Sequence, residues 1–432
     1  MSKPIAQFCS SQAFKNNSIE EKYMEITKQN LFDVLSERGL IKQSTDLEHV
    51  KKMLSKDNLV VYTGTDPTAD SLHIGHCVPA CIMRRFQMAG HKVIILVGGA
   101  TAAIGDPTGR TEMRKMLTKE QLEKNIEALK NSYGKFLKFD GDNPAIIVNN
   151  ADWFKDYSYT DFMREVGVHF NVNKMLTNDI YANRLAEGGL TFFEMGYMLM
   201  QAYDFVYLNK KYGCNLQWGG SDQWANIVAG VELGRKLNFV DGKNREMEGI
   251  TNPLLLTPEG KKMGKTEKGA LWIDPTKINA YDFYQGIYQT PDACVEMMFA
   301  LFTDMDMTEV RRLIATDIVS AKKKLSYLIT AFIQGEDKAK EAQKAAEEVF
   351  GGSGKSDNMN TAVCKGLPRG INVVDMLVEV GLCTSKGEAR RLIAQNGISL
   401  DGNKVANAEQ IVKAAEVVVS KGKKIHLLVK SK

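Results

Sequence analysis

The chain has 432 residues, enough for two or three domains at roughly 100–200 residues each. With 44% hydrophobic and 25% charged residues, its composition is globular and excludes a disordered, collagen-like or small disulfide-stapled protein. Its longest apolar runs are too short to cross a bilayer, and the first 18 residues lack the apolar core of a signal peptide. Seven scattered cysteines without a C-x-x-C pair predict reduced thiols, no zinc and a cytoplasmic location.

The net charge of +4 is unevenly distributed. Residues 365–432 carry twelve Lys and Arg against six Asp and Glu, a charge of +6, which leaves −2 for the rest of the chain. A basic tail on a slightly acidic body predicts that the tail binds a polyanion. A lysine-rich solubilising surface explains the charge alone equally well.

The first 260 residues alternate strand-like runs with amphipathic helices. The predicted strands are Leu59–Tyr62, Lys92–Val97, Ala145–Val148, Asn215–Trp218 and Pro253–Leu256. Capping boxes predict helix starts at Ser18-x-x-Glu21, Thr45-x-x-Glu48, Thr118-x-x-Gln121 and Thr191-x-x-Glu194. Strands separated by helices predict a parallel sheet, which binds ligands beyond the carboxyl ends of its strands.

Composition also divides the chain. We expect an α/β domain over residues 1–275 and an all-helical domain over 276–350, which ends in the Ala-, Lys- and Glu-rich stretch Glu336–Val349. Residues 351–370, with five glycines, read as a flexible linker to a basic domain at 371–432.

The segment Asp66–His76 follows the first predicted strand and precedes a helix that runs to about Ala89. It places two imidazoles, His73 and His76, at a helix N-terminus, where backbone N–H groups favour phosphate. Gly75 permits close approach of a ligand. The alternatives are that the two histidines occur at this spacing by chance or that they bind a metal, although zinc would lack a third ligand of obvious spacing.

Two loops bring further cations. Lys261–Thr266 (KKMGKT) follows the last predicted strand, and lysines with a glycine can form a mobile loop that closes on triphosphate oxygens. The loop Gly98–Arg110 follows the strand Lys92–Val97, with Arg114 four residues further on. Taken alone, a lysine-rich surface turn is the commoner explanation.

The helix after Thr191 carries a polar face. Tyr197, Gln201 and Asp204 stand at i, i+4 and i+7, so a phenol, an amide and a carboxylate share one side. With Gln217 and Ser221–Gln223 nearby in sequence, they predict a binding site for a small zwitterion. A polar core is the alternative, and it would need every one of these groups to be hydrogen-bonded.

The motifs HIGH (His73–His76), KMGKT (Lys262–Thr266) and GGSDQW (Gly219–Trp224) resemble those of class I aminoacyl-tRNA synthetases. The segments YTGTDPTAD after residue 61 and Y-x-x-x-Q-x-x-D at Tyr197 narrow the resemblance to bacterial-type tyrosyl-tRNA synthetases. Residues 371–405 resemble an S4-type RNA-binding domain. The resemblance implies an α/β, Rossmann-like parallel-sheet catalytic domain, an α-helical domain on the anticodon side and a small α+β S4-like domain.

The resemblance also implies roles for matching residues. Tyr62 and Asp204 would hydrogen-bond the substrate phenol; Asp106, Tyr197 and Gln201 would hold its ammonium; Gln223 would lie near its carboxylate. The adenylate would contact Gly64, Asp66, Gly75, Gly219, Asp222 and Lys265. The ATP phosphates would meet Thr68, His73, His76, Arg110, Arg114, Lys262 and Lys265. On the tail, Lys386, Arg390 and Arg391 would contact tRNA.

The implied reaction joins L-tyrosine to ATP, with Mg²⁺ arriving on the ATP, and then transfers the tyrosyl group to tRNA(Tyr). The resemblance implies a cytoplasmic homodimer with no tightly bound cofactor, no protein-held metal and no membrane. A tryptophan-specific relative is the nearest alternative, against which the Tyr62 and Asp204 pair and the S4-like tail argue. A non-catalytic RNA-binding protein is the other alternative. Against it argues the presence of the four catalytic-motif residues His73, His76, Lys262 and Lys265.

Overall fold

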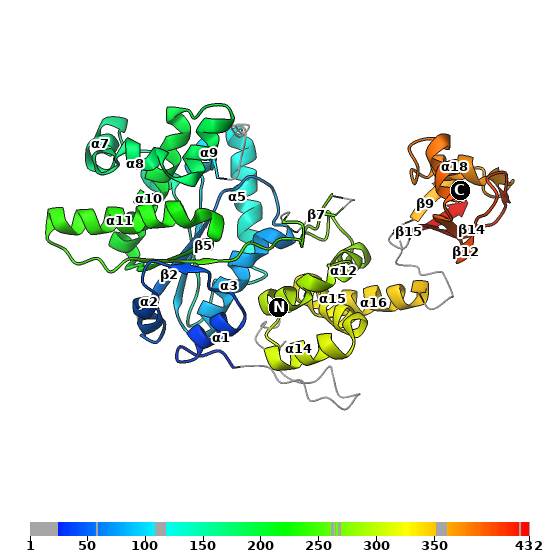
Figure 1. The fold of residues 1–432 in the computed structure, drawn as a ribbon, viewed down its shortest axis with the longest axis horizontal. Helices are drawn as coiled ribbons and strands as arrows, with labels where there is room; N and C mark the ends of the chain where they lie inside the picture. Colours follow the sequence, from blue (N-terminus) through cyan, green and yellow to red (C-terminus); the bar gives the residue numbers. More distant parts are fainter. Residues whose placement is uncertain are drawn as a thin grey trace. The chain divides into compact units, whose positions relative to one another are not determined.

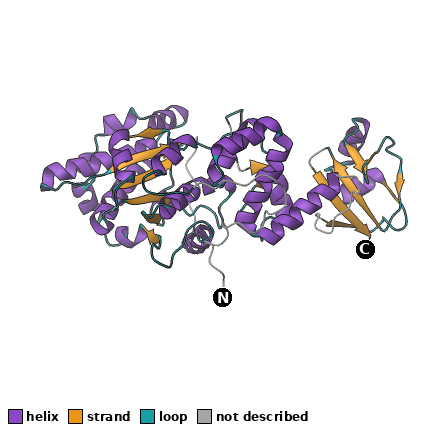
Figure 2. Ribbon diagram, turned by 90° about the horizontal axis from the view of Figure 1, so that it is seen from below, coloured by secondary structure: helices purple, strands orange, loops and turns teal. Residues whose placement is uncertain are grey.

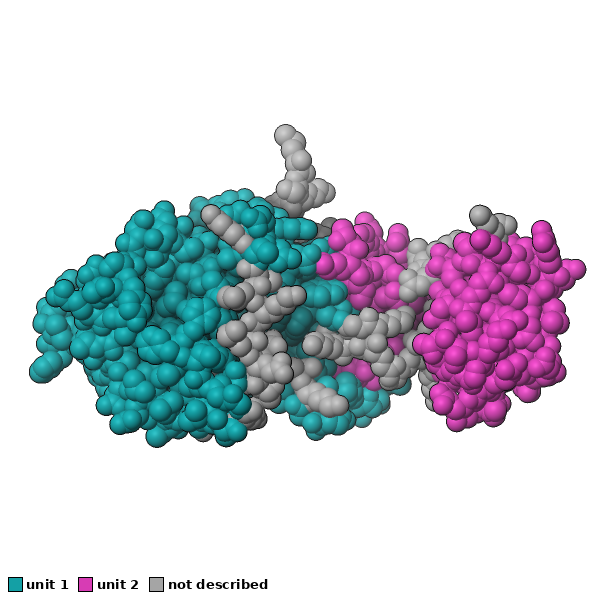
Figure 3. All heavy atoms as spheres, turned by 90° about the horizontal axis from the view of Figure 1, so that it is seen from above, with its two compact units in different colours: residues 1–274, 291–321 teal, residues 275–290, 322–432 magenta. Residues whose placement is uncertain are grey.

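The protein is described here from a computed structural model. The structure describes residues 25–57, 59–108, 118–260, 263, 265–266, 269–350, 361–422 and 425–431. The chain forms two compact units, one of residues 1–274 and 291–321 and the other of residues 275–290 and 322–432 (Figure 3).

A six-stranded sheet forms the centre of the first unit, in the order β1-β6-β5-β2-β3-β4. Its strands are β1 (Gln43–Ser44), β2 (Val60–Thr65), β3 (Lys92–Val97), β4 (Ile146–Asn149), β5 (Leu216–Gly220) and β6 (Glu248–Asn252). All neighbours pair in parallel except β1, which runs antiparallel to β6. The parallel sheet and four of the five predicted strands are therefore confirmed.

The fifth predicted strand, Pro253–Leu256, is wrong. The strand that pairs with β5 is β6, which ends at Asn252. Proline has no backbone N–H to donate to a neighbouring strand, so Pro253 ends the ladder instead of beginning it.

Helices cover both faces of this sheet (Figure 1). Helices α10 (Phe192–Tyr212) and α11 (Trp224–Asp241) pack on one face, and α3 (Cys77–Met88) packs on the other. On the α10 side the rings of Tyr62 and Phe205 lie 5.2 Å apart, and on the α3 side those of Phe86 and Trp218 lie 5.5 Å apart. Apolar layers on both faces are what a buried parallel sheet requires.

The helix starts follow the capping predictions in two places. Thr118 and Thr191 both form complete capping boxes, at α5 (Lys119–Tyr133) and α10. Helix α2 (Leu47–Leu54) is instead capped by Asp46, because the hydroxyl of Thr45 donates to Glu248. The predicted start at Ser18 lies outside the described residues.

The remaining elements of the first unit are short. They are α1 (Leu31–Glu37), η2 (Ile74–His76), α4 (Thr101–Ile104), α6 (Ala151–Phe154), α7 (Tyr159–Glu165), η3 (Gly167–His169), α8 (Val172–Leu176), α9 (Asp179–Glu187), η4 (Ser221–Gln223), β7 (Lys265–Thr266), β8 (Gly269–Ala270), η5 (Asp292–Cys294), α13 (Val295–Phe302) and α14 (Met307–Thr316). Within the described ranges, no helix combines the length and the apolar character needed to cross a membrane.

The helical pattern expected for residues 276–350 is present, but it is shared between the units. Helices α12 (Ala280–Tyr288), α16 (Glu336–Phe350) and most of α15 (Ile318–Gln334) belong to the second unit. Helices α13 and α14 belong to the first, since the buried guanidinium groups of Arg38 and Arg85 donate to backbone carbonyl oxygens of residues 300–305. Two arginines that cap the end of α13 fix it to the α/β body.

The tail forms a separate five-stranded sheet, in the order β12-β11-β14-β15-β9, with two helices (Figure 2). Its elements are β9 (Thr361–Cys364), β10 (Ile371–Asn372), α17 (Val373–Glu379), α18 (Lys386–Ala394), β11 (Ile398–Leu400), β12 (Asn403–Lys404), β13 (Ile411–Val412), β14 (Glu416–Lys421) and β15 (Ile425–Ser431). Strand β9 lies within the expected linker 351–370 and pairs in parallel with β15. The folded tail therefore includes residues 361–370, while 351–360 lie outside the described residues.

Candidate active site

The candidate site lies at the carboxyl ends of β2 and β5. From β2 the sheet continues to β3 and β4 on one side and to β5 and β6 on the other. The strand order therefore changes direction between β2 and β5, and parallel sheets bind ligands at such a switch point. Tyr62 of β2 and Gln217 of β5 are paired in register, so both side chains point toward the α10 face.

Tyr62 and Asp204 form the deepest part of the site. Tyr62 is 1% exposed, and its hydroxyl has no hydrogen-bond partner among the described residues. Burial, reinforced by the Asp204 carboxylate, raises the pKa of the Tyr62 phenol well above its ordinary value. Burial also raises the pKa of Asp204 well above its ordinary value, against the effect of two donated hydrogen bonds. A phenol without a partner near a buried carboxylate can recognise the hydroxyl group of a ligand.

Asp66 connects the strand end to α10. Its Oδ2 accepts a hydrogen bond from the hydroxyl of Tyr197 at 3.0 Å, and its Oδ1 accepts one from the hydroxyl of Thr101 at 2.9 Å. Gly98, after β3, must be a glycine here, since a Cβ at that position would collide with the Asp66 and Thr101 oxygens. Asp66 is thereby fixed at the side of the pocket rather than left in solvent.

Asn150 and Trp153 are site residues that the sequence interpretation missed. Asn150, which is fully buried, donates from Nδ2 to Asp204 Oδ2 and to Thr101 Oγ1, both at 3.1 Å. Trp153 donates from its indole nitrogen to Asp204 Oδ1 at 2.9 Å. The signal was the position of Asn149 at the end of a strand and of Asn150 directly after it, where polar side chains in a parallel sheet face the ligand.

A second carboxylate lies beyond α4. Asp106 is 8% exposed, and its Oδ2 accepts a hydrogen bond from Gln223 Nε2 at 2.8 Å. Gln223 in turn accepts from Asn226 Nδ2 at 3.1 Å. Gln223, expected near the substrate carboxylate, therefore contacts a residue expected to hold the ammonium.

Three buried oxygen atoms of the predicted site have no hydrogen-bond partner among the described residues. They are the hydroxyl of Tyr62 and the Oε1 atoms of Gln201 and Gln217. An unpartnered buried polar group costs about 1–3 kcal/mol, so a polar core would not leave three together. The arrangement favours a pocket for a polar ligand over the core alternative.

The HIGH segment lies against Met263, one of the described residues of the KMGKT segment. A Cβ on Gly75 would come within 2.8 Å of the backbone oxygen of Met263. The backbone N–H of Ile74 donates to Leu271, and that of Ile273 donates to Leu72, so the chain after KMGKT pairs with the chain around His73. The rings of His73 and His76 stack 3.7 Å apart. Gly75 and Met263, 188 positions apart in the sequence, are thus brought close together.

The other expected nucleotide-binding positions are distributed over several elements. Thr68 is exposed, in a turn that is held by a hydrogen bond from Asn125 Nδ2 to the Pro67 oxygen at 2.9 Å. Gly64, Gly219 and Asp222 stand at the ends of β2 and β5. Lys265 lies in β7, while Lys262, Arg110 and Arg114 lie outside the described residues.

The expected tRNA contacts of the tail lie on α18 in the second unit. Arg390 and Arg391 are exposed. Lys386 is also exposed but forms an ion pair with Asp375 at 2.7 Å. Of the three expected contacts, Lys386 is therefore in an ion pair, whereas no ion pair is seen for Arg390 and Arg391 among the described residues.

Comparison with known proteins agrees with the geometry. A family model described as "tRNA synthetases class I (W and Y)" matches residues 54–351, and one described as "Tyrosine--tRNA ligase SYY-like C-terminal domain" matches residues 355–429. The chain belongs to the class I tRNA synthetases. A tyrosine–tRNA ligase of Clostridium kluyveri is 48% identical over 403 residues, which cover 91% of this chain and 98% of that protein. A tyrosine–tRNA ligase of Acetivibrio thermocellus is 46% identical over 411 residues, or 93% and 99% of the two chains.

Within its class the chain is therefore a tyrosine–tRNA ligase, which activates L-tyrosine with ATP and transfers it to tRNA(Tyr). The structure is similar to a C-terminally truncated mitochondrial tyrosyl-tRNA synthetase of Aspergillus nidulans. That likeness has a TM-score of 0.66 and 28% identity, and it covers 74% of this chain and 94% of that one. The predicted function and fold class are confirmed.

Proposed function

We propose that the pocket between β2 and α10 binds tyrosine in one orientation. Its phenol contacts Tyr62 and Asp204, and its ammonium contacts Tyr197, Gln201 and Asp106. The observation that carries this assignment is the set of unpartnered buried oxygens, which includes the Tyr62 hydroxyl, proposed to contact the phenol, and Gln201 Oε1, proposed to contact the ammonium. A zwitterion with a phenol supplies donors for both.

Selectivity then follows from burial. Phenylalanine would leave the Tyr62 hydroxyl without its partner and Asp204 with only the two donors it already has. An unmet buried polar group costs about 1–3 kcal/mol, more than the loss of apolar contact with one methylene. The pocket therefore discriminates by hydrogen bonding rather than by size.

Phosphate binding is assigned to the HIGH and KMGKT region. In this proposal His73, His76, Thr68, Lys262, Lys265, Arg110 and Arg114 meet the phosphates, while Gly64, Asp66, Gly75, Gly219 and Asp222 contact the adenylate. The carboxylate of tyrosine attacks the α-phosphorus and pyrophosphate leaves. These side chains therefore act by positioning the two substrates and by stabilising the negative charge on the leaving pyrophosphate. Mg²⁺ enters as part of the ATP substrate, held mainly by phosphate oxygens.

Tyrosine-dependent ATP–pyrophosphate exchange tests these assignments. We expect exchange with tyrosine, and exchange with tryptophan alone would reject the pocket as described. Asp204→Asn should raise the KM for tyrosine because one of the two carboxylate oxygens is lost, whereas an unchanged KM would remove Asp204 from the site.

We assign tRNA binding to the tail and the catalytic role to the α/β body, with the helical segment 276–350 on the anticodon side. The +6 charge of residues 365–432 and the exposed Arg390 and Arg391 support this division. Deletion of residues 351–432 should leave adenylate formation intact and abolish transfer to tRNA. Loss of adenylate formation in that variant would contradict it.

We also propose a homodimer. Large apolar side chains are exposed along residues 159–193, whose helices α7, α8 and α9 gather in one part of the first unit (Figure 1). The set comprises Tyr159, Val168, Val172, Leu185, Phe192 and Phe193. An apolar surface of this kind is typical of a subunit interface. Light scattering should give twice the chain mass, and Phe192→Asp should give monomers; a monomeric parent protein would overturn the proposal.

The six described cysteines are buried and unpaired. We place the protein in the cytoplasm, where thiols stay reduced and where the substrates of this reaction are found. Fractionation of the source cells tests this, and a protein recovered outside the cytoplasmic fraction would contradict it.

A further inference from the structure

The first turn of α10 holds a buried ion pair that none of the roles above uses. Arg184 of α9 donates from Nε to Glu194 Oε1 at 3.0 Å, and the two side chains are 8% and 2% exposed. The other oxygen, Glu194 Oε2, accepts from the backbone N–H and the hydroxyl of Thr191, at 3.0 and 2.8 Å. Both oxygens of this carboxylate are therefore committed where little water reaches.

Glu194 lies on the same face of α10 as the tyrosine-binding residues. Glu194, Tyr197, Gln201 and Asp204 are spaced i, i+3, i+7 and i+10, which is one stripe of an α-helix. Glu194 is thus the first member of that stripe, one turn before Tyr197. A change in the direction of its side chain acts on the turn that carries the Tyr197 hydroxyl.

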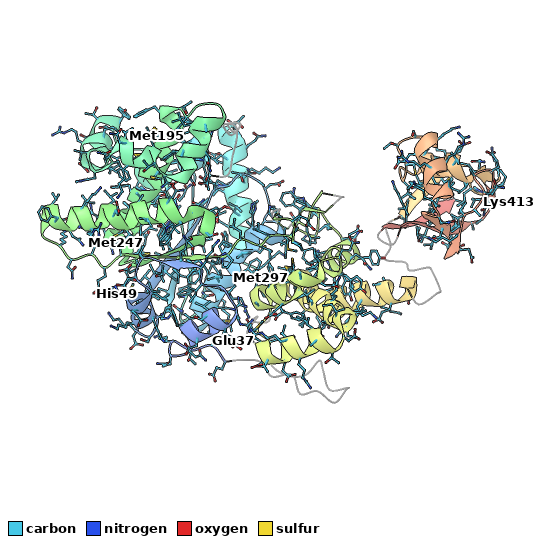
Figure 4. All side chains as sticks on the ribbon, viewed as in Figure 1. Glu37, His49, Met195, Met247, Met297 and Lys413 are labelled. Atoms are coloured by element: carbon cyan, nitrogen blue, oxygen red, sulfur yellow. The ribbon has the colours of Figure 1, made fainter. Side chains whose placement is uncertain are left out.

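A second contact from α9 holds the same turn. The hydroxyl of Tyr181 donates to the backbone oxygen of Met195 at 3.2 Å (Met195 is labelled in Figure 4). Burial, and then the carboxylates of Asp106 and Glu194, raise the pKa of the Tyr181 phenol above its ordinary value. Both carboxylates therefore lie close enough to the Tyr181 phenol to act on its ionisation, and Asp106 is the one proposed to hold the substrate ammonium.

We propose that Arg184 is a positioning residue for tyrosine binding: by pairing with Glu194 it fixes the first turn of α10 and so aims Tyr197 and Gln201 at the substrate ammonium. This rests on the proposed roles of Tyr197 and Gln201. Without Arg184, the buried Glu194 charge has no cation partner, and it either takes up a proton or turns toward water. Either response disturbs the turn in front of Tyr197.

The chain offers a matched exposed pair for comparison. Lys174 and Glu232 also lie 3.0 Å apart, but their side chains are 71% and 27% exposed. Water screens such a pair, and its geometry constrains its helices weakly. The contrast between the two pairs separates positioning from a general effect of removing a cation.

The experiment measures KM for tyrosine and for ATP by ATP–pyrophosphate exchange, and Kd for tyrosine by equilibrium dialysis. Arg184→Met should raise the tyrosine KM and Kd by about tenfold and leave the ATP KM within about twofold, because only the ammonium contacts move. Arg184→Lys should recover most of the affinity, since it restores the charge. Lys174→Met should behave as the wild-type protein.

A wild-type tyrosine KM in folded Arg184→Met, even with a lowered Tm, would overturn the proposal and leave the pair a structural contact. Equal increases in the KM values for tyrosine and for ATP would also overturn the proposal, because they would show that the variant loosens the whole active site and not the ammonium contacts alone. If Arg184→Met does not fold, the Arg184→Lys and Glu194→Gln variants test the proposal in its place. Wild-type tyrosine affinity in both variants overturns the proposal. Weakened tyrosine affinity in Glu194→Gln supports it. Gln201→Ala tests the ammonium site separately, since an unchanged KM there rejects the underlying assignment instead.

Discussion

Replacement of Asn150 by alanine should weaken tyrosine binding and the fold by different amounts. The buried Asn150 amide accepts a hydrogen bond from the backbone N–H of Ala100 at 2.7 Å and donates to Thr101 and to Asp204, both at 3.1 Å. A hydrogen bond between neutral groups contributes about 1 kcal/mol and one to a charged group about 1.5–3 kcal/mol, so the loss of two neutral bonds and one charged bond should lower stability by about 3.5–5 kcal/mol. Only the bond to Asp204 bears directly on the substrate phenol.

The cost to binding is therefore about 1.5–3 kcal/mol, which corresponds to a tenfold to hundredfold increase in the tyrosine KM. The assay is ATP–pyrophosphate exchange at saturating ATP, with Tm measured on the same preparation. Asn131→Ala, on the exposed side of α5, serves as the control and should leave both quantities unchanged. A folded Asn150→Ala protein with a tyrosine KM within about twofold of the parent would refute the reasoning.

Three further outcomes follow from the geometry. Gly75→Ala should lower both kcat for adenylate formation and Tm, because its Cβ would lie 2.8 Å from the backbone oxygen of Met263, which would have to shift; parental kinetics would contradict this contact. Gln217→Leu should raise the tyrosine KM without lowering Tm, since it removes an unpartnered buried oxygen; a lower Tm would show that the oxygen has a partner. Because the pKa of Asp204 is raised in the folded protein, the folded state binds more protons than the unfolded chain above the ordinary Asp value, and stability falls as pH rises there. The Tm of Asp204→Asn relative to the parent should therefore increase as the pH rises above about 4, the ordinary Asp value, and a constant difference would contradict the raised pKa.

The sequence predicted elements well where the determinants are local. The apolar run Lys92–Val97 lies between polar and glycine residues and forms β3 with those bounds. Thr191 and Glu194 form the capping box that their spacing indicates. The error at Pro253–Leu256 arose because apolar character continues past the point where proline ends the hydrogen-bond ladder.

The candidate site was predictable only where one element carries the pattern. The stripe of Tyr197, Gln201 and Asp204 could be read from the helix alone. Asn150 could not be assigned to Asp204, because 54 residues separate them and their contact depends on how β4 and α10 are packed. Likewise, nothing in the local sequence of Asp66 indicates that its carboxylate accepts from Tyr197, 131 residues away.

The hydrogen bonds around Asp204 also constrain any attempt to change the amino-acid specificity of this pocket. An apolar residue at position 204 would leave one N–H of the Asn150 amide and the Trp153 indole N–H without the acceptor they have now. Each would cost about 1–3 kcal/mol, enough to eliminate most single variants by instability before their specificity could be selected. Libraries that aim at a substrate without a phenol should therefore vary positions 150, 153 and 204 together, and should keep glycine at position 98.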